Sequence, residues 1–324
     1  MKAARLRGVR DWEVVDIEEP VPGPGQMLIR LEQVAVCGSD VPEYLGVHPG
    51  FPKPTGGTGH EGIGRVVSCP SGNYAEGERV LLWGFDRDHG LFQDLVLTCD
   101  EGLLRLPGDA TPERVLMAQL LGTVIRPFRK IGNVINQRVV VIGLGPTGQL
   151  FTAVLRNLGA RDIIGIDPLV WRREMATKMG ATAVLDPEAT DVTDAVEKIT
   201  GGAMADIVVE AVGDGDTYST AVDLCRRGGA VVGFGVPDKE VADGVVSLPL
   251  LKMQRKEINL VMTVNAGANP YDDYAAALDW IEQGRIDVMP LITHILPSAQ
   301  IQRAFELFAD RPPAERPIKV VLQY

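Results

Sequence analysis

Two patterns of hydrophobic and polar positions divide the chain. Over the first hundred residues, short apolar or alternating segments are separated by turn residues and not by helical stretches. Such segments predict β-strands, which we expect at residues 13–17, 27–36, 62–69, 79–83 and 91–98. Strands that follow one another without helices predict an antiparallel, barrel-like module.

From Thr111 onward, helical and strand-like segments alternate. A helix is expected over residues 112–131, with Thr111 as its N-cap and Gly132 as its end. Strands are expected at 139–142, 162–166, 183–185, 205–210 and 230–234, and helices at 148–158, 171–179, 192–199 and 217–225. This alternation predicts an α/β fold with a doubly wound parallel sheet.

The last sixty residues predict helices at 271–282 and 299–308 and a closing strand at 318–322. A closing strand that returns to the N-terminal module makes that module discontinuous. We therefore expect one domain of residues 1–122 and 265–324 and a second domain of residues 123–264. A length of 324 residues also exceeds the size at which single cores stop growing.

The composition of the chain limits the classes of partner that we expect it to bind. The net charge of −11 opposes binding to nucleic acid or to anionic membranes, and no apolar stretch is long enough to span a bilayer. The N-terminal residues lack the pattern of a secretory signal. The four cysteines show no pairing pattern, which favours a reducing, cytoplasmic location.

The sequence Gly-Leu-Gly-Pro-Thr-Gly at residues 143–148 follows an expected strand and opens an expected helix. Gly143 permits a tight turn, Gly145 lets the backbone approach a pyrophosphate, and Gly148 lets helix and strand pack closely. The N-terminus of the helix, at Pro146 and Thr147, favours an anion. The motif predicts a dinucleotide site.

Asp167 ends the next expected strand, nineteen residues after Gly148. A carboxylate at this place binds the ribose hydroxyls and repels a 2′-phosphate, so it favours NAD over NADP. Arg172 and Arg173 weaken this preference, because arginine accepts a 2′-phosphate. The alternative is a plain glycine turn with a helix-capping aspartate.

A second set of residues has the chemistry of a metal site. Cys37 follows an expected strand, and His60 and Glu61 lie in a glycine-rich stretch 23 residues later. Thiolate and imidazole are the usual zinc ligands, and a carboxylate can be a third. The alternative is a buried structural cysteine and a loop histidine.

Taken together, five motifs resemble the zinc-dependent medium-chain dehydrogenase/reductase family nearly end to end. They are Cys-Gly-Ser-Asp at 37–40, Gly-His-Glu at 59–61, the turn at 143–148, Leu-Ile-Thr-His at 291–294 and Ile-Lys-Val-Val at 318–321. The resemblance implies a Rossmann dinucleotide-binding domain and a GroES-like β-barrel catalytic domain.

The resemblance also implies roles for single residues. Cys37 and His60 match zinc ligands, and Glu61 matches a carboxylate that binds the zinc or exchanges with water beside it. Ser39 matches a hydroxyl that relays the substrate proton, and Asp40 matches the carboxylate that orients the histidine.

Two further matches carry open alternatives. Lys319 matches a basic residue that contacts the cofactor pyrophosphate, or is an ordinary exposed lysine. Gln119 takes the position of a cysteine or glutamate ligand and resembles the arrangement of archaeal glucose dehydrogenases. A neutral amide ligand leaves more positive charge on the zinc; the alternative is a helix glutamine that bonds a neighbour.

The chain departs from many relatives at three places. Residues 81–93 contain no cysteine, so we expect no structural zinc and one catalytic zinc. Pro42 stands where relatives often carry a proton-passing histidine, and His48 or Glu43 is a possible substitute. The aromatic and charged segment 82–89 suits a polar, ring-shaped substrate, or is a solvated hairpin tip.

We therefore predict reversible hydride transfer between NAD and a secondary alcohol or ketone, with a polyol, sugar or aminocyclitol as the small-molecule substrate. The alternatives are a zinc-free quinone or enone reductase of the same superfamily, an inactive NAD-binding protein, and a redox-neutral use of the hydride cycle. An apolar edge strand at 258–263 predicts a homodimer or homotetramer.

Overall fold

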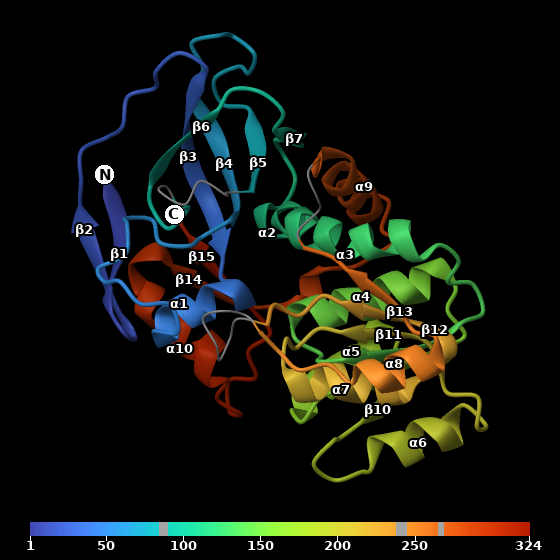
Figure 1. The fold of residues 1–324 in the computed structure, drawn as a ribbon. Coiled ribbons are helices and arrows are strands. Elements are labelled where there is room, and N and C mark those ends of the chain that lie inside the picture. The colour runs from blue at the N-terminus through green and yellow to red at the C-terminus, as the bar shows by residue number, and fades with distance from the viewer. Residues whose placement is uncertain (84–89, 238–244, 265–268) are drawn as a thin grey trace. The chain divides into compact units, whose positions relative to one another are not determined.

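The structure is a computed structural model that describes residues 1–83, 90–237, 245–264 and 269–324 of the chain. It divides into two compact units, one of residues 1–120, 274–282 and 287–324 and one of residues 121–273 and 283–286 (Figure 1). Two of the four limits, after residues 120 and 273, fall inside helices. The expected domain limits at residues 122 and 265 stay predictions.

The first unit is built on a sheet with the strand order β14-β15-β3-β4-β5-β7, in which β6 also pairs with β3. These strands are β3 (Gln26–Ala35), β4 (Glu61–Ser68), β5 (Arg79–Trp83), β6 (Leu95–Cys99), β7 (Leu104–Leu106), β14 (Ile292–Pro297) and β15 (Lys319–Gln323). All pairs are antiparallel except β14 with β15. The closing strand thus joins the N-terminal module, as expected.

This unit also contains a hairpin of β1 (Lys2–Gly8) and β2 (Asp11–Asp16), the helices α1 (Val41–Leu45), α2 (Pro112–Leu116) and α10 (Ile301–Asp310), and most of helix α9 (Tyr271–Glu282). Trp12 and Tyr44 lie 5.0 and 5.1 Å from the ring of Phe305, between ring centroids. Because α1 directly follows residues 37–40, this aromatic core fixes the segment that carries Cys37.

The strand expected over residues 91–98 begins only at Leu95. The preceding residues serve another purpose, because the Leu91 and Phe92 amides donate to the carbonyls of Gly59 and Gly56 at 2.9 and 3.0 Å. These hydrogen bonds between two loops fix the glycine-rich residues that precede His60 in the sequence.

The second unit carries a parallel sheet with the order β10-β9-β8-β11-β12-β13. Its strands are β8 (Arg138–Ile142), β9 (Asp162–Ile166), β10 (Ala183–Leu185), β11 (Ala205–Glu210), β12 (Cys225–Gly233) and β13 (Asn259–Met262). Every residue of β11 is buried, as expected for a strand covered on both faces. The strand order reverses between β8 and β11, where doubly wound folds bind their ligands.

The sheet is accompanied by α4 (Pro146–Leu158), α5 (Val170–Met179), α6 (Val192–Ile199), α7 (Gly215–Leu224) and α8 (Leu250–Lys256). The predicted α/β class with a doubly wound sheet and a separate β module is confirmed. Helix α8 was not expected, whereas β9, β10 and β11 have the predicted bounds.

The single helix expected over residues 112–131 is two helices, α2 and α3 (Ala118–Ile131), separated by Met117. Met117 has a φ of −67° and a ψ of −9°, and its amide bonds to Val115 and not to a residue four positions earlier. A new helix therefore starts at Ala118, which places Gln119 in a first turn. Helix α9 (Tyr271–Glu282) has the predicted bounds.

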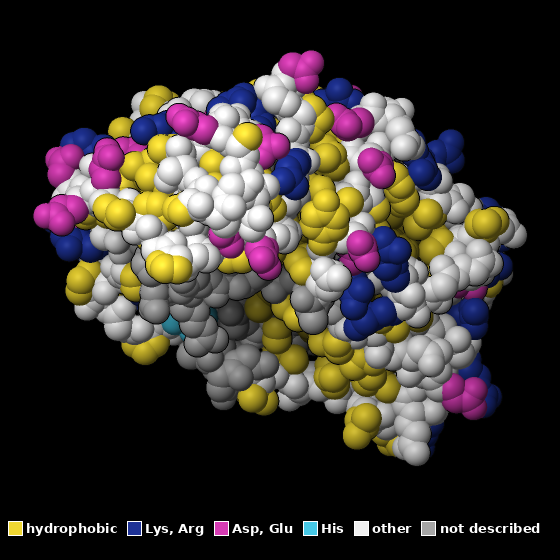
Figure 2. Space-filling view, turned by 90° about the horizontal axis from the view of Figure 1, so that it is seen from above, with side chains coloured by type: hydrophobic (Ala, Val, Ile, Leu, Met, Phe, Trp, Pro, Cys, Tyr) yellow, Lys and Arg dark blue, Asp and Glu magenta, His cyan; other side chains and the backbone are white. Residues whose placement is uncertain are grey.

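The surface carries charges of both signs. Figure 2 shows Lys and Arg side chains interspersed with Asp and Glu on one face of the molecule, so the excess of negative charge does not gather into one patch there. No helix within the described residues is long and apolar enough to cross a membrane.

Candidate functional site

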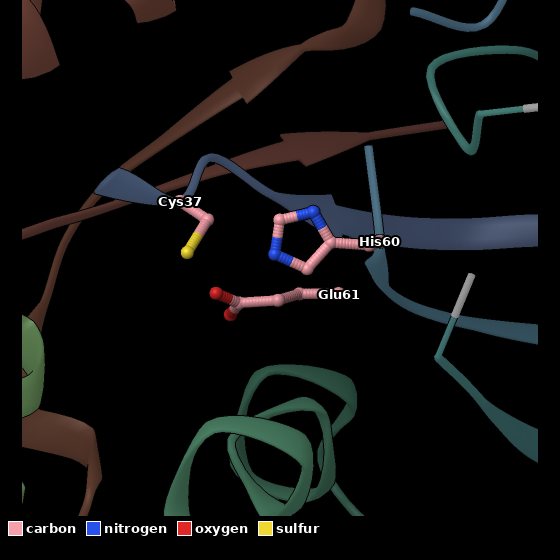
Figure 3. Close-up of side chains that lie close together, drawn as sticks. All are labelled: Cys37, His60 and Glu61. Atoms are coloured by element: carbon pink, nitrogen blue, oxygen red, sulfur yellow. The ribbon is translucent and has the colours of Figure 1, made fainter. Parts of the chain in front are cut away.

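Strand pairing brings the predicted metal ligands together. Cys37 lies just beyond the end of β3, His60 precedes β4, and Glu61 is the first residue of β4. Because β3 and β4 are antiparallel with Ala35 opposite Glu61, all three residues lie at one end of the sheet. Their ligand atoms lie within 4.8 Å of one another. Figure 3 shows the sulfur, a ring nitrogen and the carboxylate turned toward a common point.

Asp40 and Thr58 lie beside the Nδ1 atom of His60. The Nδ1 atom of His60 lies 2.9 Å from the carbonyl oxygen of Thr58 and 3.5 Å from Asp40 Oδ1. A proton on Nδ1 would be donated to the Thr58 carbonyl and would leave the lone pair of Nε2, 3.4 Å from Ser39 Oγ, for a ligand. Asp40 is buried, and its Oδ2 accepts the Cys37 amide at 2.8 Å. The Asp40 carboxylate thus lies beside the His60 ring, and its role in orienting the ring stays a prediction.

The charges of this cluster stabilise one another. Burial alone lowers the pKa of His60, but the Asp40 carboxylate and Cys37 outweigh it and raise this pKa well above its usual value. Burial alone raises the pKa of Asp40, but His60, Thr58 and the Cys37 amide lower it. Asp40 is thus held as a carboxylate beside the ring.

Glu61 forms a buried ion pair with Lys319. The Lys319 Nζ atom donates to Glu61 Oε2 at 2.6 Å and to the Val36 carbonyl at 3.1 Å, and both charged side chains are 1% exposed. The interpretation of Lys319 as an ordinary exposed lysine is therefore wrong. The reason is the sheet order, since β15 and β4 flank β3. Contact of Lys319 with a cofactor pyrophosphate stays a prediction.

Gln119 is buried close to the same strands. Helix α2, which ends three residues before Gln119, packs against β3 and β4. The Gln119 Nε2 atom lies 3.5 Å from the hydroxyl of Tyr274, so the glutamine does contact a neighbour through its nitrogen. Its Oε1 atom is buried and accepts no hydrogen bond from the described part of the chain.

The donor set fits a zinc ion. A thiol, an imidazole and a carboxylate converge, and one oxygen of Glu61 and the oxygen of Gln119 have no hydrogen-bond partner among the residues that the structure describes. Buried polar atoms normally have partners, and these are atom types that bind zinc. The geometry therefore supports a metal site, with its ligands still to be tested.

The three glycines of the dinucleotide turn differ in the room that their surroundings leave for a side chain. Gly143 has a φ of +87°, and a Cβ on Gly148 would lie 1.9 Å from the Gly143 carbonyl oxygen. A Cβ on Gly145 would meet nothing nearer than 3.9 Å, at Arg172 Nη1. Gly145 is also the N-cap of α4, with Pro146 as the first helical residue. The open space at Gly145 fits the approach of a phosphate to the helix N-terminus.

Asp167 shapes this turn from the end of β9. Its Oδ2 accepts the Leu144 amide at 2.8 Å, and its Oδ1 accepts the Leu169 amide at 2.9 Å. Arg172 Nη1 lies 3.5 Å from Oδ2. Arg173 instead bonds the carbonyls of Asp167 and Pro168 and pairs with Asp186. Of the two arginines, Arg172 is the one beside the carboxylate and Gly145.

A cavity of about 350 Å³ in the second unit was not expected from the sequence. It lies at the carboxyl ends of β12 and β13, and its lining includes Phe234, Val236, Thr263, Val264 and Arg126. Ligands of doubly wound folds bind beyond the carboxyl ends of the strands. The positions that follow each strand are thus the signal in the sequence that could have found this cavity.

Glu43 and His48 are the possible substitutes for the relay histidine that the chain lacks at position 42. Glu43 pairs with Lys53, whose ammonium also donates to the His48 carbonyl at 3.1 Å. Pro42 is buried in α1. Leu82 and Trp83 end β5, and residues 84–89 of the proposed substrate segment lie outside the described residues.

A group of candidate metal ligands in the first unit and a candidate phosphate-binding turn on the doubly wound sheet of the second unit are features expected of a dehydrogenase that uses a nicotinamide cofactor. Residues 23–108 match the alcohol dehydrogenase GroES-like domain family, and residues 146–283 match the zinc-binding dehydrogenase family. The chain belongs to the zinc-type medium-chain dehydrogenase/reductase family and is a dehydrogenase that acts on CH–OH groups.

Its relatives have modest identity and nearly full coverage. The chain is 27% identical to an L-threonine 3-dehydrogenase of Caldanaerobacter subterraneus subsp. tengcongensis, with 91% of each chain covered. It is 28% identical to an alcohol dehydrogenase of Cupriavidus necator, with 96% of each covered. The solved structure of the alcohol dehydrogenase TADH from Thermus sp. ATN1 is similar over 100% of both chains, with 25% identity and a TM-score of 0.89.

Proposed function

We propose that the protein is an NAD-linked dehydrogenase with one catalytic zinc, and that it interconverts a polar secondary alcohol and its ketone. The substrate class is a polyol, sugar or aminocyclitol. The observation that carries this proposal is the convergence of Cys37, His60 and Glu61 within 4.8 Å, in a chain that also has a dinucleotide turn.

Cys37 and His60 would hold the zinc, together with Gln119 or Glu61. A zinc ion bound there supplies a positive charge that polarises the substrate oxygen. Asp40 contributes by fixing the proton of His60 on Nδ1 through its contact with that atom. The cluster is the only group of three close His, Cys, Asp or Glu residues found in the described ranges, which supports a single zinc.

In the oxidation, a bound nicotinamide would supply the hydride acceptor, and Ser39 would take the proton of the substrate hydroxyl while passing its own proton on. Ser39 is exposed and lies 3.4 Å from His60 Nε2, so its hydroxyl is at the cluster and also reaches water. Water therefore takes the proton from Ser39 without a histidine at position 42, where the chain has Pro42.

The cofactor preference follows from the charge at the end of β9. Asp167 is held as an acceptor of two backbone amides beside the phosphate turn, and its charge repels a 2′-phosphate. Arg173 is taken up by Asp186 and two carbonyls, which leaves Arg172 as the arginine that offsets Asp167. These contacts support NAD over NADP.

The polar substrate is supported by the family and by the ligand set. L-threonine 3-dehydrogenases are among the relatives, and threonine is a secondary alcohol with other polar groups. A neutral Gln119 ligand would leave more positive charge on the zinc than a thiolate ligand would. This greater charge suits a hydroxyl flanked by electron-withdrawing groups.

Four cysteines without disulfides support a cytoplasmic location.

A homodimer or homotetramer is supported by the edge of the parallel sheet. Strand β13 forms one of the two edges of this sheet, and Leu260, Met262 and Val264 on or just after it are exposed. An apolar edge strand is a template for pairing with another copy of the chain.

Metal analysis combined with NAD or NADP reduction across a panel of polyols, sugars and aminocyclitols tests the proposal. Cys37→Ser should lose both the zinc and the activity. Cys69→Ser, which changes a partly exposed cysteine outside the cluster, should keep both. An active, metal-free protein would instead support the zinc-free reductase.

A further inference from the structure

We propose that Tyr274 is a positioning residue that holds the amide of Gln119 with its oxygen free to bind the metal. This inference rests on the proposed function, since it assigns the way in which the fourth ligand is presented. Nothing in the pattern of the sequence singled out Tyr274, which lies 155 residues from Gln119.

The ring of Tyr274 is locked against the strands of the metal cluster. Tyr274 lies in α9 and is fully buried. Its ring centroid is 4.8 Å from that of Trp83, with an interplanar angle of 50°. Trp83 ends β5, where it pairs with Glu61. The ring that carries the Tyr274 hydroxyl therefore packs on Trp83, the residue that pairs with the candidate ligand Glu61.

The amide of Gln119 has two orientations with opposite chemistry. Its oxygen is an acceptor and can bind a metal, whereas its nitrogen carries two donor hydrogens and cannot. The terminal torsion of glutamine is broad and roughly two-fold, so the backbone does not choose between these orientations.

A tyrosine hydroxyl can accept from the amide nitrogen or donate to the amide oxygen, and the structure has the first arrangement. The Tyr274 hydroxyl lies 3.5 Å from Gln119 Nε2 and accepts from this nitrogen, while Gln119 Oε1 is buried and has no hydrogen-bond partner within the described ranges. A contact of 3.5 Å is at the long limit of a hydrogen bond. Its effect is hence on the orientation of the amide more than on the stability of the fold.

An ion pair at Asp273, the residue before Tyr274, fixes the start of α9. Asp273 is buried, accepts from Arg129 and lies 3.7 Å from Arg126 Nη1. Both arginines belong to α3, the helix that also carries Gln119. An ion pair next to Tyr274 thus joins α9 to the helix whose glutamine Tyr274 contacts.

The test is the zinc affinity of Tyr274→Phe, measured by competition with a chromogenic chelator. Phenylalanine keeps the ring on Trp83 and removes the hydroxyl. We expect zinc binding to weaken roughly ten-fold, in the range found for groups that orient metal ligands. The cobalt-substituted variant should also show altered visible absorption bands, because the ligand set changes.

Tyr74→Phe is the matched control. Tyr74 is also a buried tyrosine of the first unit, and its hydroxyl donates to the Leu103 carbonyl and accepts its amide, both at 2.9 Å. Its loss should lower stability and leave zinc affinity and the cobalt spectrum unchanged. Equal zinc loss in both variants would mean that Tyr274 acts only through stability, which overturns the proposal.

A double-mutant cycle with Gln119→Cys gives an independent test, because a thiolate has a single ligand atom and no orientation to set. Tyr274→Phe should weaken zinc binding in the protein that keeps Gln119 and have no effect in the Gln119→Cys background. An equal effect in both backgrounds overturns the role of Tyr274. A parent protein that binds no zinc through Cys37 and His60 overturns the proposed function itself.

Discussion

Replacing Lys319 by methionine should destabilise the metal-free protein strongly. Methionine keeps most of the side-chain volume but leaves the Glu61 carboxylate buried without its counter-charge at 2.6 Å. At an effective dielectric constant of about 20, the lost attraction is about 6 kcal/mol. Relief of the desolvation of Lys319 offsets part of this, so we expect a loss of about 3–5 kcal/mol in the free energy of unfolding.

Urea unfolding followed by circular dichroism, with and without zinc, measures this loss. Zinc should reduce it, because a cation near Glu61 replaces the missing ammonium. Adding Glu61→Gln to Lys319→Met should recover most of the metal-free stability, since no unpaired charge then stays buried.

Two results would refute the reasoning. One is a loss below about 1 kcal/mol for Lys319→Met, which would place the pair in a well-solvated environment. The other is a double variant whose loss equals the sum of the single losses, which would mean that the two charges do not interact.

Three further predictions concern the second unit. Burial raises the pKa of the Cys225 thiol to about 11, so the stability that the buried neutral thiol contributes is complete below pH 9 and is lost as the pH rises toward 11. This loss in the free energy of unfolding is at most about 2.7 kcal/mol, and Cys225→Ala should lose less stability between these pH values, measured by urea unfolding. Gly145→Ala should fold normally, because its Cβ meets nothing nearer than 3.9 Å, but should bind NAD at least ten-fold more weakly in a calorimetric titration. Gly148→Ala should also lower the melting temperature, since its Cβ would lie 1.9 Å from the Gly143 carbonyl oxygen; equal melting temperatures for the two variants would contradict this steric argument.

The sequence by itself determined the features that depend on local pattern. The alternation of strands and helices predicted the doubly wound sheet, and β9, β11 and α9 have the predicted bounds. The sequence also predicted the glycine turn and Asp167 as a dinucleotide site, because their spacing is set by one strand, one turn and one helix; cofactor binding there stays a prediction. The helix expected over 112–131 was one exception, since its apolar periodicity continues through the break at Met117.

Only the tertiary structure decided how distant side chains meet. The pairing of β3 with β4 brings Cys37 to His60 and Glu61, and the place of β15 beside β3 buries Lys319 against Glu61, 258 residues away. The contact of Gln119 with Tyr274 is equally remote in the sequence. The motifs predicted one site for Cys37, His60 and Glu61, but strand order and helix packing are set by the burial of the whole core, so no local pattern records that Lys319 contacts Glu61 or that Tyr274 contacts Gln119.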